Sequence, residues 1–148
     1  MNTVSLIASV LGMILGTAGL SISLSNYLRD RPKIRVTLKW DMTDAQTGQM
    51  FGLAKVTNVG RRPVFISVVA LELPKGFARS DLILDTSMAG TKLSEGDKPI
   101  AHIINQTDLA QYSVQWQKIR AYAEDSTNRS YFSKPPKKNS KKPSWVVP

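Results

Sequence analysis

The chain has 148 residues, of which 42% are apolar, 21% are charged and none is cysteine. This length suits one ordinary domain, and the composition excludes a collagen, a disulfide-stapled secreted module and a fully disordered chain. The net charge is +9: residues 29–35 carry +3, residues 134–148 carry +5, and only +1 is left for all the others. Two basic flanks therefore enclose a nearly neutral centre.

Residues 1–28 contain no charged side chain, and residues 4–24 form an apolar run interrupted only by serine and threonine. A helix over this run is long enough to cross a hydrocarbon core of about 30 Å. The hydroxyl groups are tolerated there because they can bond back to the carbonyl one turn earlier. A cleaved signal peptide would carry Lys or Arg before the run, and a buried helix seldom extends so far without a charge. We expect residues 1–28 to form a transmembrane helix.

The basic residues near this helix predict its orientation. No Lys or Arg precedes the helix, whereas residues 29–35 follow it directly, and Tyr27 stands at the expected membrane interface. The positive-inside rule then places the N-terminus outside and the rest of the chain in the cytoplasm, with a bacterial inner membrane as the expected location. The basic side chains of this juxtamembrane segment are expected to contact anionic lipid or a partner. They are Arg29, Arg31, Lys33 and Arg35.

Small residues recur every four positions in the helix at Ala8, Gly12 and Gly16. They share one helix face, and such a small-xxx-small pattern lets two helix backbones approach closely in lipid. Glycine is also simply common in membrane helices. We expect this face to pack against a second copy or a partner helix.

Residues 33–42 alternate between polar and apolar side chains after Pro32, a pattern typical of a strand with one buried face. The apolar centre of 64–73 predicts a strand buried on both faces. Residues 107–116 fit either a strand or a short helix capped by Thr107 or Asp108, and we favour the helix. The expected strands are 33–42, 51–57, 64–73, a short edge strand at 82–84, 100–104, 118–124 and 129–133, with turns at 58–63, 94–97 and 125–128.

These strands predict a mainly β fold, with an antiparallel β-sandwich over residues 36–133 after the single N-terminal transmembrane helix. The segments 54–60 and 63–66, joined by an Asn-x-Gly turn, resemble a strand–turn–strand unit of immunoglobulin-like domains. Asp108-Leu109-Ala110-Gln111-Tyr112 is similar to the segment before strand F, with Val114 at the position of a disulfide cysteine. The chain resembles uncharacterised bacterial and phage membrane-anchored proteins with an immunoglobulin-like β-sandwich. The resemblance implies a fold and no activity.

The sequence offers little for catalysis or cofactor binding. His102 is the only histidine, no cysteine is present, and the acidic residues are scattered. Zinc sites and calcium loops need several such ligands at close spacing, and the glycines form no phosphate loop. We expect no enzymatic activity, no cofactor, no metal and no small-molecule substrate.

Residues 134–148 form a tail rich in lysine and proline that cannot bury a core of its own, so we expect it to be extended or disordered when free. Its basic residues could contact anionic lipid or a partner, and Trp145 adds an apolar anchor. A solvated tail is the simpler alternative. Nucleic acid is not expected, because aromatic residues are not interleaved with the lysines. The residues expected to make contact are Lys137, Lys138, Lys141, Lys142 and Trp145.

The sequence favours a non-enzymatic accessory or structural subunit that positions a partner protein at the bilayer through its β-sandwich. The alternative is a membrane effector or sensor whose β-domain binds a ligand and whose helix oligomerises to perturb the bilayer. An outward-facing adhesion domain would require the opposite topology.

Overall fold

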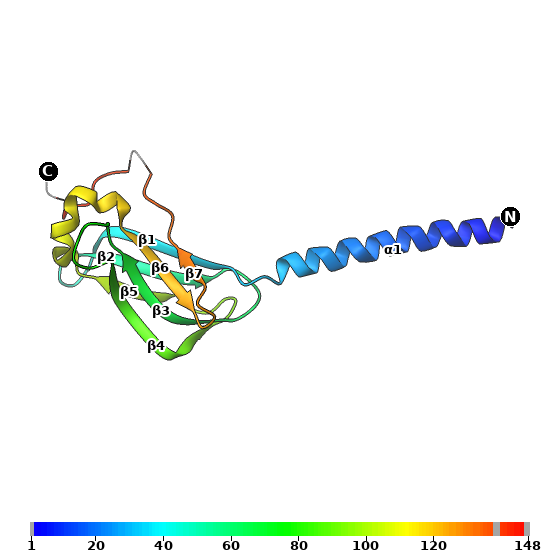
Figure 1. Cartoon of the computed structure of the whole chain (residues 1–148), viewed down its shortest axis with the longest axis horizontal. Coiled ribbons are helices and arrows are strands. Elements are labelled where there is room, and N and C mark those ends of the chain that lie inside the picture. Colours follow the sequence, from blue (N-terminus) through cyan, green and yellow to red (C-terminus); the bar gives the residue numbers. More distant parts are fainter. Residues whose placement is uncertain (1, 138–139, 147–148) are drawn as a thin grey trace.

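A computed structural model describes residues 2–137 and 140–146 of the chain. Helix α1 (Thr3–Arg29) projects from one end of a β domain, and the 3-10 helix η1 (Gln106–Lys118) and the C-terminal segment lie at the other end (Figure 1). The strands are β1 (Ile34–Thr43), β2 (Met50–Asn58), β3 (Val64–Glu72), β4 (Asp81–Leu93), β5 (Ile100–Ile104), β6 (Arg120–Asp125) and β7 (Ser130–Phe132).

The strands form two antiparallel sheets, so the fold is mostly β as expected. One sheet has the order β1-β2-β5 and the other has the order β4-β3-β6-β7. Each pairing described is antiparallel. The inner strands are therefore β2 in one sheet and β3 and β6 in the other, while β1, β5, β4 and β7 form the edges.

Both sheets contribute side chains to one buried hydrophobic cluster, and η1 closes it with Leu109 and Tyr112. Removing these apolar groups from water is the main favourable contribution to folding. The sheet residues in the cluster include Val36, Ala54, Val56 and Ile104 from one sheet and Val69, Leu71, Ala121 and Ala123 from the other.

Strand β1 follows the predicted alternation at first and then departs from it. Val36 is buried, and Arg35 and Lys39 are exposed on the opposite face. The pairing with β2 shifts between Lys39 and Met42, and Asp41 there has a φ of 54°. This bulge was not predicted, because polar and apolar residues alternate without interruption through residues 33–42 and nothing in that pattern marks the extra residue.

The prediction for β3 is confirmed, whereas that for β4 is wrong in length. Val69, Ala70 and Leu71 are consecutive and all buried, so side chains on both faces of β3 are covered at its centre. Strand β4 covers 13 residues and not the short segment 82–84. Much of it is exposed, with few buried apolar positions to mark it, so its sequence pattern resembles a loop.

The helix favoured over residues 107–116 is confirmed, but its cap is not the one expected. Asn105 caps η1, because its side-chain oxygen accepts a hydrogen bond from the Thr107 backbone N–H. Val114 lies within η1 and is 90% exposed, so its comparison with a core cysteine of strand F is wrong. The next strand, β6, begins only at Arg120.

Helix α1 makes no buried contact with the β domain. Its hydroxyl groups bond back to carbonyl oxygens one turn earlier, as expected: Ser9 to Ser5, Thr17 to Met13 and Ser21 to Thr17. These three hydroxyl donors are thereby satisfied within the helix. The helix is long and apolar enough to cross a membrane.

Candidate functional site

The segment that joins α1 to β1 packs tightly against the turn between β2 and β3. The backbone N–H of Val59 donates to the carbonyl oxygen of Lys33 over 2.8 Å. A Cβ atom on Gly60 would lie 2.6 Å from both the carbonyl oxygen of Arg31 and the backbone nitrogen of Lys33. Only glycine permits this approach, which fixes the chain as it leaves the helix.

The side chain of Asn58 holds this turn in shape. Its amide nitrogen donates to the carbonyl oxygens of Arg62 and Leu93, and its oxygen accepts from the Gly60 N–H. Asn58 is only 5% exposed, so losing these bonds would leave buried polar groups without partners. The Asn-x-Gly turn expected from the sequence therefore positions Arg62 beside the helix junction.

The side chain of Asp125 holds the hairpin between β6 and β7 in shape. Its carboxylate accepts hydrogen bonds from the backbone N–H groups of Thr127 and Arg129 and from the hydroxyls of Thr127 and Tyr131. Burial alone would raise the pKa of this carboxyl, but the hydrogen bonds, led by that of the Thr127 hydroxyl, outweigh burial and lower the pKa. These hydrogen bonds fix the backbone of the hairpin at Arg129.

These two turns and the helix end enclose a groove of about 470 Å³. Four cationic residues line it with a single acid. Arg31 also lies over the ring of Tyr27, with its guanidinium carbon 5.4 Å from the ring centroid. We call this the junction groove. Its lining residues are Tyr27, Asp30, Arg31, Pro32, Lys33, Arg62 and Arg129.

The cations of the junction groove have no ion-pair partner in the described part of the chain. Two close contacts between basic and acidic side chains are found there, the Arg120–Glu72 ion pair and the approach of His102 to Asp85, and both lie outside the groove. Several unneutralised cations around one concavity create a positive potential that attracts anions. The arrangement is therefore chemically suited to bind an anionic group.

The structure separates the residues predicted to contact lipid or a partner into distinct places. Arg31 and Lys33 line the junction groove. Arg29 ends α1, and Arg35 is exposed on β1, opposite Thr57 of β2, so neither lines the groove. Sequence reasoning missed Arg62 and Arg129. Their only signal was that Arg62 lies in a predicted turn and Arg129 directly follows one, and the pattern does not say that the two turns meet.

The small residues of α1 form an open face. Ala8, Gly12 and Gly16 are all exposed, and apart from the adjacent residues and the nearby helix backbone no atom lies within 4 Å of a Cβ atom placed on either glycine. This face is free to approach another helix.

The tail residues that the structure describes return to the β domain rather than extending away from it. Pro143 is buried, and Trp145 packs against the hydrophobic core. The backbone N–H and hydroxyl of Ser144 donate to the carboxylate of Asp41, over 2.9 Å and 2.6 Å. This docking at the end of the domain opposite α1 differs from the free tail expected from its composition (Figure 1).

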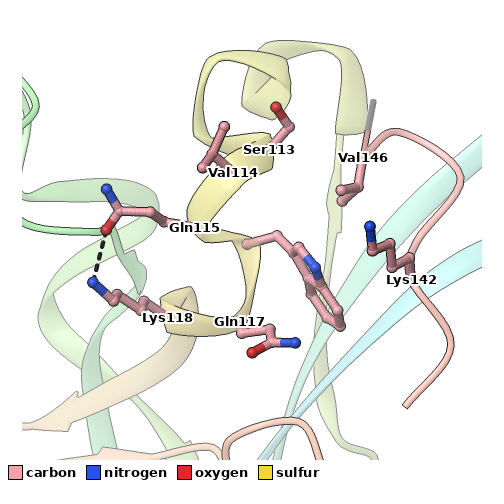
Figure 2. A pocket seen from close by; sticks show the side chains of 8 residues that line it. Ser113, Val114, Gln115, Gln117, Lys118, Lys142 and Val146 are labelled. Carbon is pink, nitrogen blue, oxygen red and sulfur yellow. Dashed lines mark hydrogen bonds between the residues drawn. The ribbon is translucent and has the colours of Figure 1, made fainter. Parts of the chain in front are cut away.

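None of the tail lysines that the structure describes lines the junction groove. Lys137, Lys141 and Lys142 are exposed, and Lys138 lies outside the described residues. Lys142 and Val146 line a hollow of about 530 Å³ against η1. Figure 2 shows them facing the helical segment that carries Ser113 and Val114, while Lys118 donates a hydrogen bond to Gln115 nearby.

The described residues contain no cluster of three or more His, Cys, Asp or Glu side chains able to hold a metal ion. His102 lies on β5, with its Nε2 atom 3.6 Å from a carboxylate oxygen of Asp85 on β4. No protein-family model matches the chain, and a search of curated proteins gave no significant match.

Proposed function

We propose that this chain is a non-enzymatic, single-pass membrane subunit that positions a partner protein at the bilayer through its β domain. The observation that carries the proposal is helix α1. It is apolar on all sides, uncharged up to its last residue, and makes no buried contact with the domain. Such a surface is stable only when lipid or other helices cover it.

The basic residues around the base of α1 support an N-outside topology with a cytoplasmic domain. Arg29, Arg31 and Lys33 follow the helix directly, and folding brings Arg62 and Arg129 to the same end of the domain. The positive-inside rule relates such charge beside a helix to the cytoplasmic face, which for a bacterial chain is that of the inner membrane.

The strand order supports an immunoglobulin-like sandwich as the architecture of the domain. In that fold, strands A, B and E form one sheet, and strands C, F and G belong to the other. Sheet β1-β2-β5 corresponds to A-B-E, and sheet β4-β3-β6-β7 corresponds to C′-C-F-G. Domains of this architecture serve many binding roles, so the fold itself implies no particular partner.

The free edge of β4 supports a role in protein contact. Within residues 2–137 and 140–146, strand β4 pairs with β3 alone, and it is 13 residues long. Ile83 and Met88 on this strand are strongly exposed apolar side chains. A long edge strand of this kind can accept a further strand from a partner.

A membrane effector or sensor is the second candidate, and the open face of Ala8, Gly12 and Gly16 favours it. Helices with such a face can associate in lipid. An effector would harm cells when α1 is overproduced, and its helices would self-associate. A subunit would instead co-purify in fixed proportion with one other protein.

Two experiments test the proposed function. Reporters fused to the C-terminus measure topology: a cytoplasm-specific reporter should be active and a periplasmic one inactive, whereas the reverse would support an outward-facing adhesion domain.

Gentle-detergent purification of the whole chain with quantitative mass spectrometry should recover one stoichiometric partner. The double variant Ile83→Lys/Met88→Lys should lose it. The matched variant Ile103→Lys/Val114→Lys makes the same change at two exposed apolar side chains on β5 and η1 and should keep it. Recovery of the chain alone would contradict the subunit role.

A further inference from the structure

We propose that the junction groove binds the anionic phosphate headgroup of a lipid in the leaflet next to the β domain. The inference rests on the proposed function, because it requires α1 to span the bilayer. It goes further by defining a site with particular residues, in which Arg62 and Arg129 act together with Arg31 and Lys33.

The position of the groove along the chain matches the depth of lipid headgroups. If the apolar residues 4–24 occupy the hydrocarbon core, the next two turns of α1 lie in the headgroup layer, since a helix rises about 1.5 Å per residue. Tyr27 belongs to those turns and lines the groove. Tyrosine favours this interfacial layer. A headgroup would therefore meet the groove without leaving its own leaflet.

The balance of charge in the groove favours an anion. The carboxylate of Asp30 and the partial negative charge at the C-terminal end of α1 oppose anion binding. Four cations outweigh these two contributions. No acid lies within ion-pair distance of any of the four among residues 2–137 and 140–146. A bound phosphate would supply the missing counter-charge.

The chemistry of the cations matches phosphate in particular. Three of the four are arginines, whose planar guanidinium groups can donate two parallel hydrogen bonds to phosphate oxygens. They come from three separate parts of the chain: the helix junction at Arg31, the β2–β3 turn at Arg62 and the β6–β7 hairpin at Arg129. A ligand at their meeting point would be contacted from several directions, unlike a lipid attracted to one flexible basic run.

The groove is also held in place before any ligand binds. Asn58 fixes the turn of Arg62, and Asp125 fixes the hairpin of Arg129 through hydrogen bonds to backbone groups. The close contact at Gly60 fixes the segment that carries Arg31 and Lys33. A volume of about 470 Å³ is within the usual range for sites of small ligands. Such preorganisation lowers the entropic cost of binding.

The test uses the whole chain purified in a neutral maltoside detergent and titrated by calorimetry with dioctanoyl phosphatidylglycerol. Dioctanoyl phosphatidylcholine and inorganic phosphate serve as the comparison ligands. Binding of the anionic lipid should be saturable at one site, and the double variant Arg62→Gln/Arg129→Gln should weaken it by about tenfold or more. The matched variant Lys75→Gln/Arg79→Gln removes the same charge from the β3–β4 connection and should bind normally.

The conservative variant Arg62→Lys/Arg129→Lys keeps the charge and should bind more weakly than the wild type, because it loses the paired hydrogen bonds. If the groove variant and the matched variant lose affinity for the anionic lipid equally, binding depends on net charge alone and the proposed site is wrong. Inorganic phosphate binding as tightly as the anionic lipid would overturn the lipid as its ligand. Absence of saturable binding of the anionic lipid would also contradict the proposed site. If alkaline carbonate releases the chain from membranes, α1 does not span the bilayer and the proposed anchoring is wrong. If the chain stays in the membrane but does not bind the lipid, only the proposed site is wrong.

Discussion

The indole rings of Trp40 and Trp145 meet edge to face, with ring centroids 5.3 Å apart and ring planes at 63°. Trp40 lies on β1 and Trp145 in the C-terminal tail, so the pair joins the tail to the three-stranded sheet. Gly52 on β2 makes room for Trp40, because a Cβ atom there would lie 2.8 Å from its ring. The Nε1 atom of Trp145 is buried with no hydrogen-bond partner among the described residues. Burying this donor unpaired reduces the free energy that the docking of Trp145 contributes to stability.

Trp145→Ala should lower the free energy of unfolding of the β domain by about 1–2 kcal/mol, because it removes the aromatic pair and part of the buried apolar area. Trp145→Phe keeps an edge-to-face partner and should cost less. Denaturant unfolding followed by near-ultraviolet circular dichroism measures both the stability and the Trp–Trp signal. Unchanged unfolding and an unchanged spectrum in the alanine variant would mean that the tail does not dock in solution.

Gly60→Ala should destabilise the domain by about 1–3 kcal/mol, because its Cβ atom must displace backbone atoms of Arg31 and Lys33. The neighbouring Val59 is exposed, so Val59→Ala serves as the control and should have little effect. Thermal unfolding of the two variants side by side measures the difference. Equal melting temperatures would show that the helix junction does not pack as described.

Asp125→Asn should cost about 1–3 kcal/mol at pH 7, since several donors lose a charged acceptor. The folded state lowers the pKa of Asp125 below its ordinary value of 3.8. The carboxylate therefore stabilises the fold fully above that value, and this stabilisation is lost as the pH falls through the lower, folded-state pKa.

Denaturant unfolding of wild type and Asp125→Asn across a pH series tests the sign of this effect. The difference between the two should be constant near neutral pH and shrink on the acid side of about pH 4. The exposed Glu95→Gln variant is the control and should show a much smaller difference. A gap that widens as the pH falls would contradict the hydrogen-bonded carboxylate.

Gly12→Ile/Gly16→Ile should weaken association of α1 by about 1–2 kcal/mol if its small face packs against another helix. Met13→Ile/Thr17→Ile alters positions one residue further along, on a different face, and should leave association unchanged. Crosslinking or energy transfer in lipid vesicles measures the association. Equal association of all three forms would indicate that the small face contacts only lipid.

Replacing Lys137, Lys138, Lys141 and Lys142 by glutamine should leave the affinity of the whole chain for anionic lipid unchanged. The three of these lysines that the structure describes lie in the tail segment that leads to the end of the domain away from α1 (Figure 1). The lipid titration described above, repeated at low and high salt, checks this. Salt-sensitive binding that disappears with the four lysines would restore the lipid contact first expected for the tail.

Local patterns in the sequence were sufficient to predict most of the elements. The uncharged run before Arg29 predicts a single long helix because its length and polarity are properties of a contiguous segment. The alternation in β1 and the unbroken apolar centre of β3 likewise report which faces are buried. The turn formers around Asn58 and Asp125 predict reversals of the chain at those places.

Only the tertiary structure decided which of these local features meet. Arg62 and Arg129 are far apart in the sequence, and their approach to Arg31 depends on how two turns pack against one helix end. The docking of Trp145 on Trp40 depends in the same way on the path of a tail whose composition predicts no structure. A sequence pattern records what each segment prefers by itself. Contacts between distant segments arise from packing and from hydrogen bonds that form only when the whole chain is folded.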